Sequence, residues 1–219
     1  MISLRLSTIL LVAAAVGLCG CQSNPVLRKR GLDALADGQL TQAEAHLTKA
    51  IDQAPTDWRA HFYLGKVFLR ADRDLDAQLS LEKALALAPD GHYAAVIIDD
   101  LAAAHFKQGD YKGLAVLLKK VCDANGKSYD FRRQGNFLAQ MGDPDGAIRA
   151  LRKAAKFAPE DVQPHVDMAN LYKSMGDSTR EIESLRRAYM IKPNNPQVNK
   201  RLQAYGQVPG PTAGLHPQD

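Results

Sequence analysis

The sequence contains no arrangement of residues that is typical of an active site. It has no glycine-rich phosphate loop, no dinucleotide-binding fingerprint and no Gly-x-Ser-x-Gly segment. No Cys or His residues are paired at the spacing of a metal-binding motif. The sequence therefore predicts a protein that is not an enzyme and that uses no cofactor and no metal.

Two acidic segments are the remaining candidates for chemistry. Asp99 and Asp100 are adjacent, so on a helix their side chains point about 100° apart, and we interpret them as surface acids. The segment 143–146, Asp-Pro-Asp-Gly, has the start of a calcium loop, but its glycine comes too early and the later Glu is missing. An N-cap at Asp143 followed by Pro144 explains this segment without a metal. We expect packed or solvent-exposed helix positions for His46, His61, His105 and His165.

One residue near the amino end has a clear chemical role. Leu6 to Leu18 is an uncharged run of 13 residues, which is the length of a signal-peptide core and too short to cross a bilayer easily. The segment that closes this run, Leu18-Cys19-Gly20-Cys21, resembles the lipobox of bacterial lipoproteins. The resemblance implies a signal peptide at 1–20, cleavage before Cys21, and acylation of the Cys21 sulfur and of its new amine. Ordinary secretion and an uncleaved anchor are the alternatives.

The residue after Cys21 bears on the location. Gln22 stands there, and no Asp. In bacteria with two membranes, the lipoprotein resemblance then implies sorting to the outer membrane, with the chain facing the periplasm. Two or more acyl chains anchor a protein stably, whereas one gives only marginal binding. We therefore expect a lipid-anchored protein of the cell envelope.

The composition fits a helical, packed chain. The 219 residues are 46% hydrophobic and carry a formal net charge of +4, which is too small to indicate nucleic-acid binding. Aromatic residues make up only 6%, and alanine is abundant, which suits close helix packing. Once Cys21 is acylated and the signal peptide is removed, Cys122 is the only free cysteine, and we expect it to be a small buried residue.

Small residues and prolines recur at a fixed interval and define the elements of the fold. At an offset of 34 residues, Gly31 falls on Gly65 and Ala50 on Ala84. Later units repeat the pattern with Gly135, Ala154, Ala188, and with Pro55, Pro89, Pro159 and Pro193 near the end of each unit. This spacing resembles the tetratricopeptide repeat, a helix–turn–helix unit of 34 residues. The resemblance covers about residues 24–205.

The resemblance implies an all-α fold, a right-handed superhelical solenoid of about five helix–turn–helix repeats with a C-terminal capping helix. A tether at 21–27 leads into repeats at about 24–57, 58–91, 95–127, 128–161 and 162–195, followed by the cap at 196–205 and a disordered Pro/Gly-rich tail at 206–219. The third repeat is the poorest, because Leu114 replaces a small residue and Gly126 replaces proline. In the cap, we expect a polar outer face made by Asn199, Lys200, Arg201 and Gln203.

The repeat pattern has a physical reason. Two antiparallel helices approach closely only where side chains are small, and proline ends the second helix because it cannot continue one. Glycine between the two helices of a unit supplies a positive φ at the helix end. This role is expected for Gly38, Gly109, Gly142 and Gly176. The fifth repeat departs from the pattern at Glu181, where the family prefers Ala.

In this family the first helix of each unit lines a concave face that contacts ligands. Carried over to this sequence, the ligand-contacting positions predict a basic groove with interleaved aromatic residues, which includes Arg59, Phe62, Lys66, Arg70, Lys107, Tyr129, Arg132, Asn136, Asn170 and Lys173. Some members clamp a C-terminal carboxylate with a basic residue and an Asn, which Arg132 and Asn136 match. Asp167 stands where the clamp has a second Asn. A plain solvated face is the alternative.

The sequence thus favours a membrane-anchored scaffold that binds a protein or peptide partner in its groove. The expected partner is acidic or has a free C-terminal carboxylate, and nucleic acid and metal are not expected. Envelope lipoproteins with such repeats act in pilus or secretion biogenesis and in cell-wall enzyme scaffolding. The alternatives are a self-associating structural component of the outer membrane and an accessory domain of an envelope enzyme.

Overall fold

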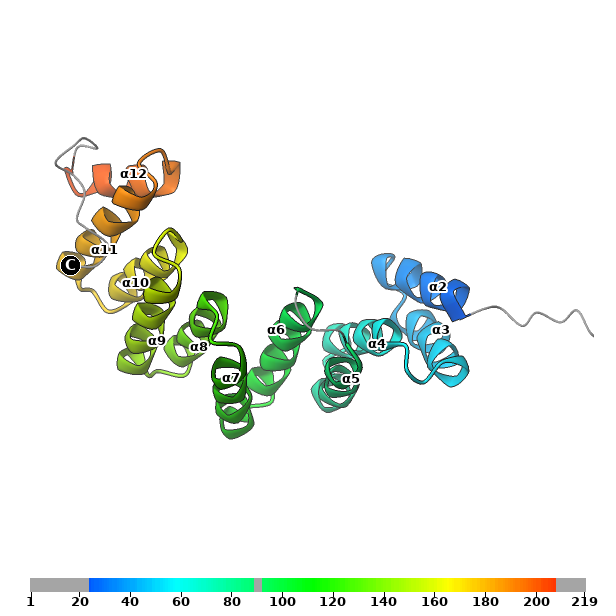
Figure 1. Cartoon of the computed structure of the whole chain (residues 1–219). Helices are drawn as coiled ribbons and strands as arrows, with labels where there is room; N and C mark the ends of the chain where they lie inside the picture. Colours follow the sequence, from blue (N-terminus) through cyan, green and yellow to red (C-terminus); the bar gives the residue numbers. More distant parts are fainter. Residues whose placement is uncertain (1–23, 89–91, 208–219) are drawn as a thin grey trace, which may run out of the picture. The chain divides into compact units, whose positions relative to one another are not determined.

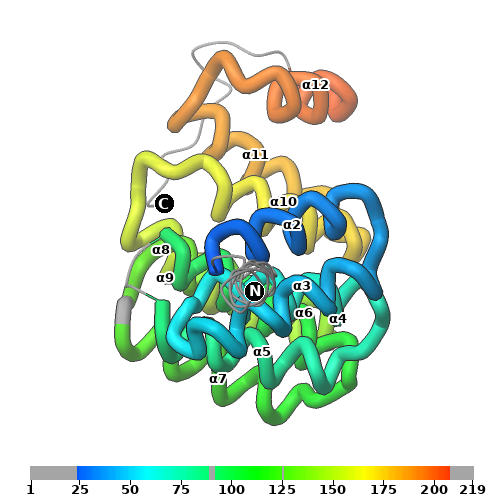
Figure 2. Tube along the Cα trace, turned by 90° about the vertical axis from the view of Figure 1, so that its right-hand side faces the viewer, coloured from blue at the N-terminus to red at the C-terminus, as the bar shows by residue number. Residues whose placement is uncertain are grey.

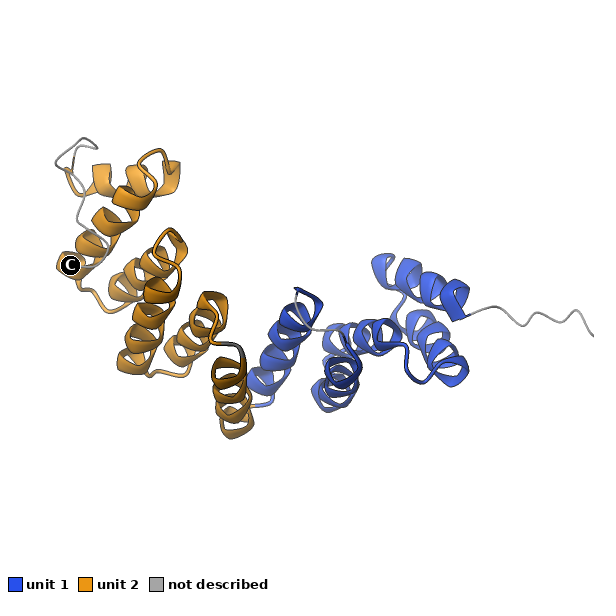
Figure 3. Ribbon diagram, in the orientation of Figure 1, with its two compact units in different colours: residues 1–108 blue, residues 109–219 orange. Residues whose placement is uncertain are grey.

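The computed structural model describes residues 24–88 and 92–207 as α-helices joined by short turns (Figure 1). These residues fall into two compact units, 1–108 and 109–219, which are coloured separately in Figure 3. Unit 1 contains α2 (Asn24–Ala36), α3 (Leu40–Gln53), α4 (Trp58–Arg70), α5 (Asp74–Leu87) and α6 (His92–Lys107). Unit 2 contains α7 (Tyr111–Asn125), α8 (Ser128–Gln140), α9 (Pro144–Phe157), α10 (Gln163–Ser174), α11 (Ser178–Ile191) and α12 (Pro196–Ala204).

Successive helices pack as hairpins within each unit. In unit 1, α2 packs on α3 and α4 on α5, and in unit 2, α8 packs on α9 and α10 on α11. The hairpins can be followed in the Cα trace of Figure 2. Each hairpin also contacts the next helix along the chain, as α3 does with α4 and α9 with α10. The prediction of an all-α fold built from helix–turn–helix units is therefore confirmed.

The small residues lie where the helices of a hairpin come closest. A Cβ added to Gly65 would stand 2.7 Å from Cγ of Leu81, which is a steric clash. Gly31 meets Leu47 and Gly135 meets Leu151 in the same way. The small residues of the second helices, including Ala50, Ala84, Ala154 and Ala188, are completely buried. Glycine is thus needed in these three hairpins so that a leucine of the second helix can pack against the backbone of the first.

The turns between the first and second helices of the repeats use the left-handed backbone conformation. Gly38, Gly109, Gly142 and Gly176 have φ between 71° and 80°, as their position after a helix predicts. The second hairpin has Asp72 at the equivalent position, with φ of 53°. Asp tolerates this conformation better than most residues because its side chain bonds locally. The repeat pattern expects glycine at this position, so it does not predict the left-handed conformation of Asp72.

Acidic and amide side chains cap the helix starts. Asp143 accepts a hydrogen bond from the amide of Gly146 at 2.8 Å, and Pro144 begins α9. The expected N-cap is thus confirmed, and it accounts for the acidic segment at 143–146. Side-chain caps of the same kind stand before α4, α7, α11 and α12, at Asp57, Asp110, Asp177 and Asn195.

Some expected boundaries fall beyond the described residues, and one differs. The signal peptide, Cys21, Pro89 and residues 208–219 of the expected tail lie outside them. Helix α6 begins at His92, three residues before the expected start of the third repeat. Leu114, which replaces a small residue in that repeat, is fully buried in α7.

The capping helix corrects one expectation. Val198 and Leu202 are buried against the last hairpin, in a cluster with Ala169 and Leu185. Arg201, however, is not part of a polar outer face. Its guanidinium donates to the carboxylate of Glu181 at 2.6 Å, since that buried acid needs a charged partner.

Candidate partner-binding face

The ten residues predicted for the groove lie on α4, α6, α8 and α10, the first helices of their repeats, and we call them the first-helix face. Five belong to unit 1 and five to unit 2, so they form two sets. The unit 1 set is Arg59, Phe62, Lys66, Arg70 and Lys107. The unit 2 set is Tyr129, Arg132, Asn136, Asn170 and Lys173.

In unit 1, Lys66 is neutralised by the next repeat. Its ammonium lies 3.5 Å from the carboxylate of Asp100 on α6 and 5.3 Å from the ring centre of Phe62. Burial raises the pKa of Asp100, and the charge of Lys66 opposes that rise. Asp99 is exposed whereas Asp100 is half-buried and paired, so the expectation of two surface acids is wrong for Asp100.

Two other cations of unit 1 also bond within the unit. Arg70 donates to the backbone carbonyl of Leu35 on α2 at 2.6 Å. Lys107 lies 2.9 Å from Asp72, the residue that occupies the left-handed turn. A hydrogen bond from Lys107 to Asp72 raises the pKa of this lysine. These two cations therefore join neighbouring helices of unit 1, and a ligand would have to compete with those bonds.

Arg59 takes part in an aromatic cluster at the start of α4. Its guanidinium lies 4.4 Å from the ring centre of Trp58 and 5.6 Å from that of Tyr93. The two rings are themselves 4.9 Å apart and tilted. Arg59 and Tyr93 are exposed whereas Trp58 is buried, so the cluster presents a cation and a phenol ring to solvent.

In unit 2, Arg132 repeats the arrangement of Lys66. Its Nε donates to Asp167 on α10 at 2.8 Å, and both side chains are largely buried. In the clamp, the basic residue at the position of Arg132 would bind a C-terminal carboxylate. Here Asp167 already pairs with that residue. A ligand carboxylate would have to displace Asp167 to reach Arg132.

Four residues of the unit 2 set are exposed: Tyr129, Asn136, Asn170 and Lys173. Among the described residues, none bonds the side chain of Asn136 or forms an ion pair with Lys173. Tyr129 is also exposed, and its ring lies within 5.8 Å of Lys127 and 5.7 Å of Arg133. An amide, an ammonium and a phenol are therefore available to a partner on α8 and α10.

Asn170 is joined to the capping helix. Its side-chain oxygen accepts a hydrogen bond from Arg201 at 2.7 Å, and the same guanidinium bonds Glu181. Tyr205 donates a second hydrogen bond to Glu181 at 2.7 Å. Burial alone would raise the pKa of Glu181, but the hydrogen bonds from Arg201 and Tyr205 and the charges of Arg201 and Lys173 together outweigh it, so the pKa lies below its usual value. Asn170 therefore serves as part of a polar contact between α10 and α12.

Sequence reasoning missed a second buried charge pair. Asp130 and Arg133 on α8 are both buried and lie 2.8 Å apart. Burial raises the pKa of Asp130 in spite of the arginine. Two opposite charges three residues apart in a helix are the only signal for this pair, and such spacing is common on exposed helix faces too.

The cysteine and the histidines have packing roles. Cys122 is buried, as expected, and burial raises the pKa of its thiol to about 11. His105 and His165 are buried, and His61 contacts the carbonyl oxygen of Pro55. Burial lowers the pKa of His165 to about 4. Over residues 24–88 and 92–207, no three His, Cys, Asp or Glu side chains gather as a metal site requires.

The helix hairpins described above are those of the family whose sequence models match this chain. Two models of the tetratricopeptide repeat match the chain, one at residues 28–95 and the other at 133–161 and 162–195. Together these segments cover more than half of the sequence. The chain belongs to the tetratricopeptide repeat family. In the part of the chain that the structure describes, no helix has both the length and the apolar character needed to cross a bilayer.

Solved tetratricopeptide repeat structures share the fold at low identity. The crystal structure of YrrB, described as a TPR protein with an unusual peptide-binding site, is 18% identical with a TM-score of 0.52, and the match covers 82% of this chain and 90% of YrrB. A MamA protein is 18% identical with a TM-score of 0.59, covering 86% and 98%. TTC0263 of Thermus thermophilus is 18% identical with a TM-score of 0.54, covering 83% and 98%. A comparison with curated protein sequences gave no significant match.

Proposed function

We propose that this tetratricopeptide repeat protein is a lipid-anchored scaffold of the cell envelope that binds a protein or peptide partner through its first-helix face. The observation that carries the proposal is the set of exposed groups on α8 and α10 of unit 2. Tyr129 and Asn136 on α8 offer a ring and an amide, and Lys173 on α10 offers a cation, and each of these helices packs on the second helix of its hairpin. The peptide-binding site described for YrrB supports the same use of the fold.

The chemistry of the partner follows from which groups are free. The amide of Asn136 can bond the backbone of an extended segment, since it carries both a donor and an acceptor. Lys173 favours an acidic side chain or a terminal carboxylate at its end of the face. Arg132 is the weaker candidate for that contact, because Asp167 already bonds it. An acidic extended segment is therefore the proposed ligand.

The proposed anchor is acylated Cys21, which lies three residues before the first residue of α2. Its support is the lipobox-like segment at the end of an apolar run. The proposed location is the outer membrane, facing the periplasm, with a role in pilus or secretion assembly or in scaffolding cell-wall enzymes. Cys21→Ser should abolish labelling of the full chain by radioactive palmitate, and labelling that persists would rule out this anchor.

The partner-binding proposal is tested by capture from detergent-solubilised envelopes. The variant Asn136→Ala/Lys173→Glu is compared with Gln203→Ala/Lys120→Glu, which likewise replaces one amide by alanine and one lysine by glutamate, at exposed positions outside the first-helix face. The proposal expects a protein that the natural chain and the control retain and that the first variant loses. Equal retention by both variants would remove the first-helix face from consideration. Retention of only further copies of this chain would favour the self-associating structural role.

A further inference from the structure

A row of cations runs along the outer side of α9. Arg149, Arg152, Lys153 and Lys156 are spaced by three and four residues, so they share one helix face. All four are exposed. The row spans the eight residues 149–156, about 10 Å along the helix axis. We call these four residues the α9 basic face.

The α9 basic face lacks the acids that neutralise the first-helix face. Arg132 and Lys66 each bond an acid of the following repeat. Within the described residues, Arg149, Arg152 and Lys156 have no ion pair or hydrogen bond through their side chains. Lys153 has the ring of Phe131 at 5.7 Å, and its charge acts on the Cys122 thiol, but no acid of the described helices pairs with it. Like charges three and four residues apart destabilise a helix. Local stability therefore does not account for this row.

The repeat itself provides a reference for these positions. The same outward positions in unit 1 are also exposed, and they are Ala45, Thr48, Lys49 and Asp52 on α3 and Leu79, Glu82, Lys83 and Ala86 on α5. Each of those sets has one cation and one anion, so its charge cancels. Only α9 carries four cations at this repeat position. The charge is thus not a requirement of the fold.

The second half of the chain is also more positively charged than the first half. Residues 109–219 contain 17 Lys and Arg and 12 Asp and Glu, whereas residues 1–108 contain 11 and 12. Positive charge is therefore concentrated in unit 2. On α9 this charge stands on an outer helix, not on the first-helix face that the proposed function uses.

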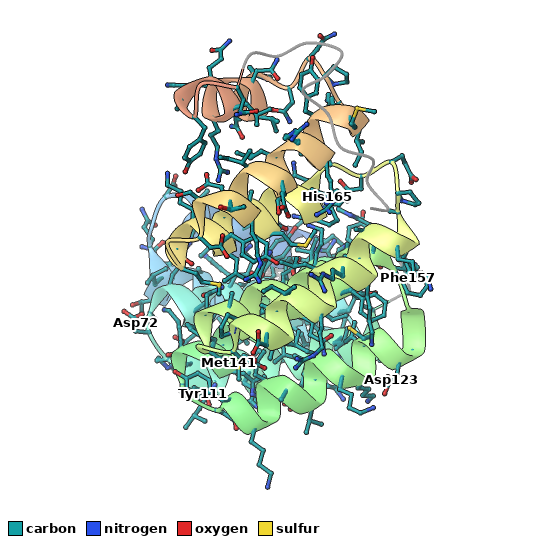
Figure 4. The ribbon with its side chains drawn as sticks, turned by 90° about the vertical axis from the view of Figure 1, so that its left-hand side faces the viewer. Asp72, Tyr111, Asp123, Met141, Phe157 and His165 are labelled. Carbon is teal, nitrogen blue, oxygen red and sulfur yellow. The ribbon has the colours of Figure 1, made fainter. Side chains whose placement is uncertain are left out.

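An exposed aromatic residue adjoins the cations. Phe157 ends α9, follows Lys156 directly and is 59% exposed. Figure 4 shows it at the edge of the ribbon, at the end of α9. Its ring stacks on Phe131, with ring centres 5.2 Å apart, so it is held in place. Helices that lie on a membrane surface use Lys and Arg for anionic headgroups and aromatic side chains such as Phe for the interfacial layer, and this end of α9 exposes both kinds of group.

We propose that the α9 basic face and Phe157 form a contact site for a membrane surface that contains anionic lipids. The long cationic side chains reach separate headgroups, and Phe157 enters the interfacial layer. The choice of a membrane over an acidic protein rests on the proposed anchor at Cys21, because an anchored chain meets lipid at a high effective concentration. A weak contact is then sufficient to orient unit 2 on the bilayer.

The test uses the chain from Gln22 to Asp219, which keeps every described helix and lacks the proposed anchor. It is sedimented with phosphatidylcholine vesicles that either contain or lack phosphatidylglycerol, at low and high salt. We expect binding only to the anionic vesicles, and only at low salt. Arg152→Glu/Lys153→Glu should reduce the partition coefficient by about tenfold or more, because each cation near an anionic surface contributes measurably to binding.

The matched control is Lys49→Glu/Lys83→Glu, which changes the net charge by the same amount at the two unit 1 positions equivalent to Lys153. It should bind nearly as the natural chain does. Arg149→Gln/Lys156→Gln gives a second, milder test, in which charge is removed without reversal and a smaller loss is expected. The helical circular dichroism signal of each variant establishes that it is folded.

Three results would overturn the proposal. The first is a natural chain that does not bind anionic vesicles at low salt. The second is an equal loss in the α9 variant and in the unit 1 control. The third is binding to polyglutamate but not to vesicles, which would assign the face to an acidic protein. None of these bears on palmitate labelling at Cys21, so failure here is distinct from failure of the anchor.

Discussion

At the scale of single residues, the contact between a glycine and a leucine sets how closely two helices approach. Gly65 lies against Leu81 with no room for a methyl group. Completely buried alanines such as Ala84 stand further along the second helix and are equally intolerant of added volume. Because interiors are packed as densely as organic crystals, extra atoms at these positions must displace a neighbour.

Ala84→Leu should therefore destabilise the protein. Overpacking a filled core costs about 1–3 kcal/mol, so the urea midpoint of unfolding should fall. Ala86→Leu is the control, since Ala86 is exposed on the same helix and should change stability little. If the two leucine variants unfold at the same urea concentration, the close packing inferred at Ala84 is wrong.

A second effect at this scale concerns His165, whose pKa is lowered to about 4 by burial and by the charge of Arg187, with Asp161 opposing. The unfolded chain takes up a proton near pH 6.5, whereas the folded chain resists it until about pH 4. The contribution of neutral His165 to stability is thus complete above pH 6.5. It should be lost progressively as the pH falls from about 6.5 to about 4.

The measurement is the free energy of unfolding as a function of pH for the natural chain and for His165→Leu. The variant should lose stability less steeply between about pH 6.5 and about pH 4, since it has no buried group to protonate. His92→Gln is the control, because His92 is exposed. A slope in His165→Leu equal to that of the natural chain would contradict the inference. His165 lies among the helices of unit 2, where Figure 4 labels it.

At the scale of elements, the capping helix is held by both apolar and polar contacts. Val198 and Leu202 supply the apolar part. Arg201 and Tyr205 supply the polar part by bonding Glu181, which is only 2% exposed. A buried acid without its cation is strongly unfavourable, whereas the complete pair can be close to neutral in free energy. The pair therefore fixes where α12 sits more than it adds stability.

Removing one member of this pair should cost more than replacing both. Arg201→Ala leaves Glu181 without its cation and should destabilise the chain by roughly 2–4 kcal/mol, less than the loss for a fully buried pair because the arginine side chain is 23% exposed. The double variant Glu181→Leu/Arg201→Met should recover part of this loss. Chemical denaturation measures both, and a double variant weaker than Arg201→Ala would argue against an unpaired buried charge.

The hairpins could be predicted from the sequence because they depend on local patterns. Gly31, Gly65 and Gly135 indicate where the two helices of a hairpin approach closely. The glycines of the turns indicate residues with a positive φ. The groove charges were harder to predict. The register placed Lys66 and Arg132 on the first helices, but it did not predict that Asp100 and Asp167, one repeat further on, would neutralise them. Pairing across repeats depends on side-chain reach, which a one-repeat pattern does not contain.

The turn at Asp72 and the contacts of Glu181 escaped prediction because the chain uses an uncommon residue at each position. Asp72 takes a left-handed conformation that the pattern reserves for glycine. Glu181 stands where the family has a small residue, and its partners Arg201 and Tyr205 come from the capping helix, which lies outside the repeat pattern. The departure from the pattern at Glu181 therefore marked a residue that contacts the end of the chain beyond the repeats.

At the scale of the whole molecule, stability in a repeat chain comes from each hairpin and from its contacts with the next. In such chains a repeat contacts only its neighbours, so stability is close to a sum of local terms. The contacts observed within each unit follow this rule, because each hairpin packs on the helix that follows it. A local defect should therefore loosen its own hairpin and the adjacent helices, and leave distant ones unchanged.

Hydrogen exchange followed by mass spectrometry tests this expectation with two matched variants. Ala84→Leu should accelerate exchange in α4 and α5 and in the adjacent α3 and α6, and leave α10 and α11 as they are in the natural chain. Ala188→Leu, at the equivalent completely buried position of the fifth repeat, should accelerate exchange in α10, α11 and α12 and leave α4 and α5 unchanged. Acceleration of all helices in both variants would show that the chain opens as one cooperative block. In that case the stability of α8 and α10, and hence of the proposed partner-binding face, would depend on every repeat and not only on its neighbours.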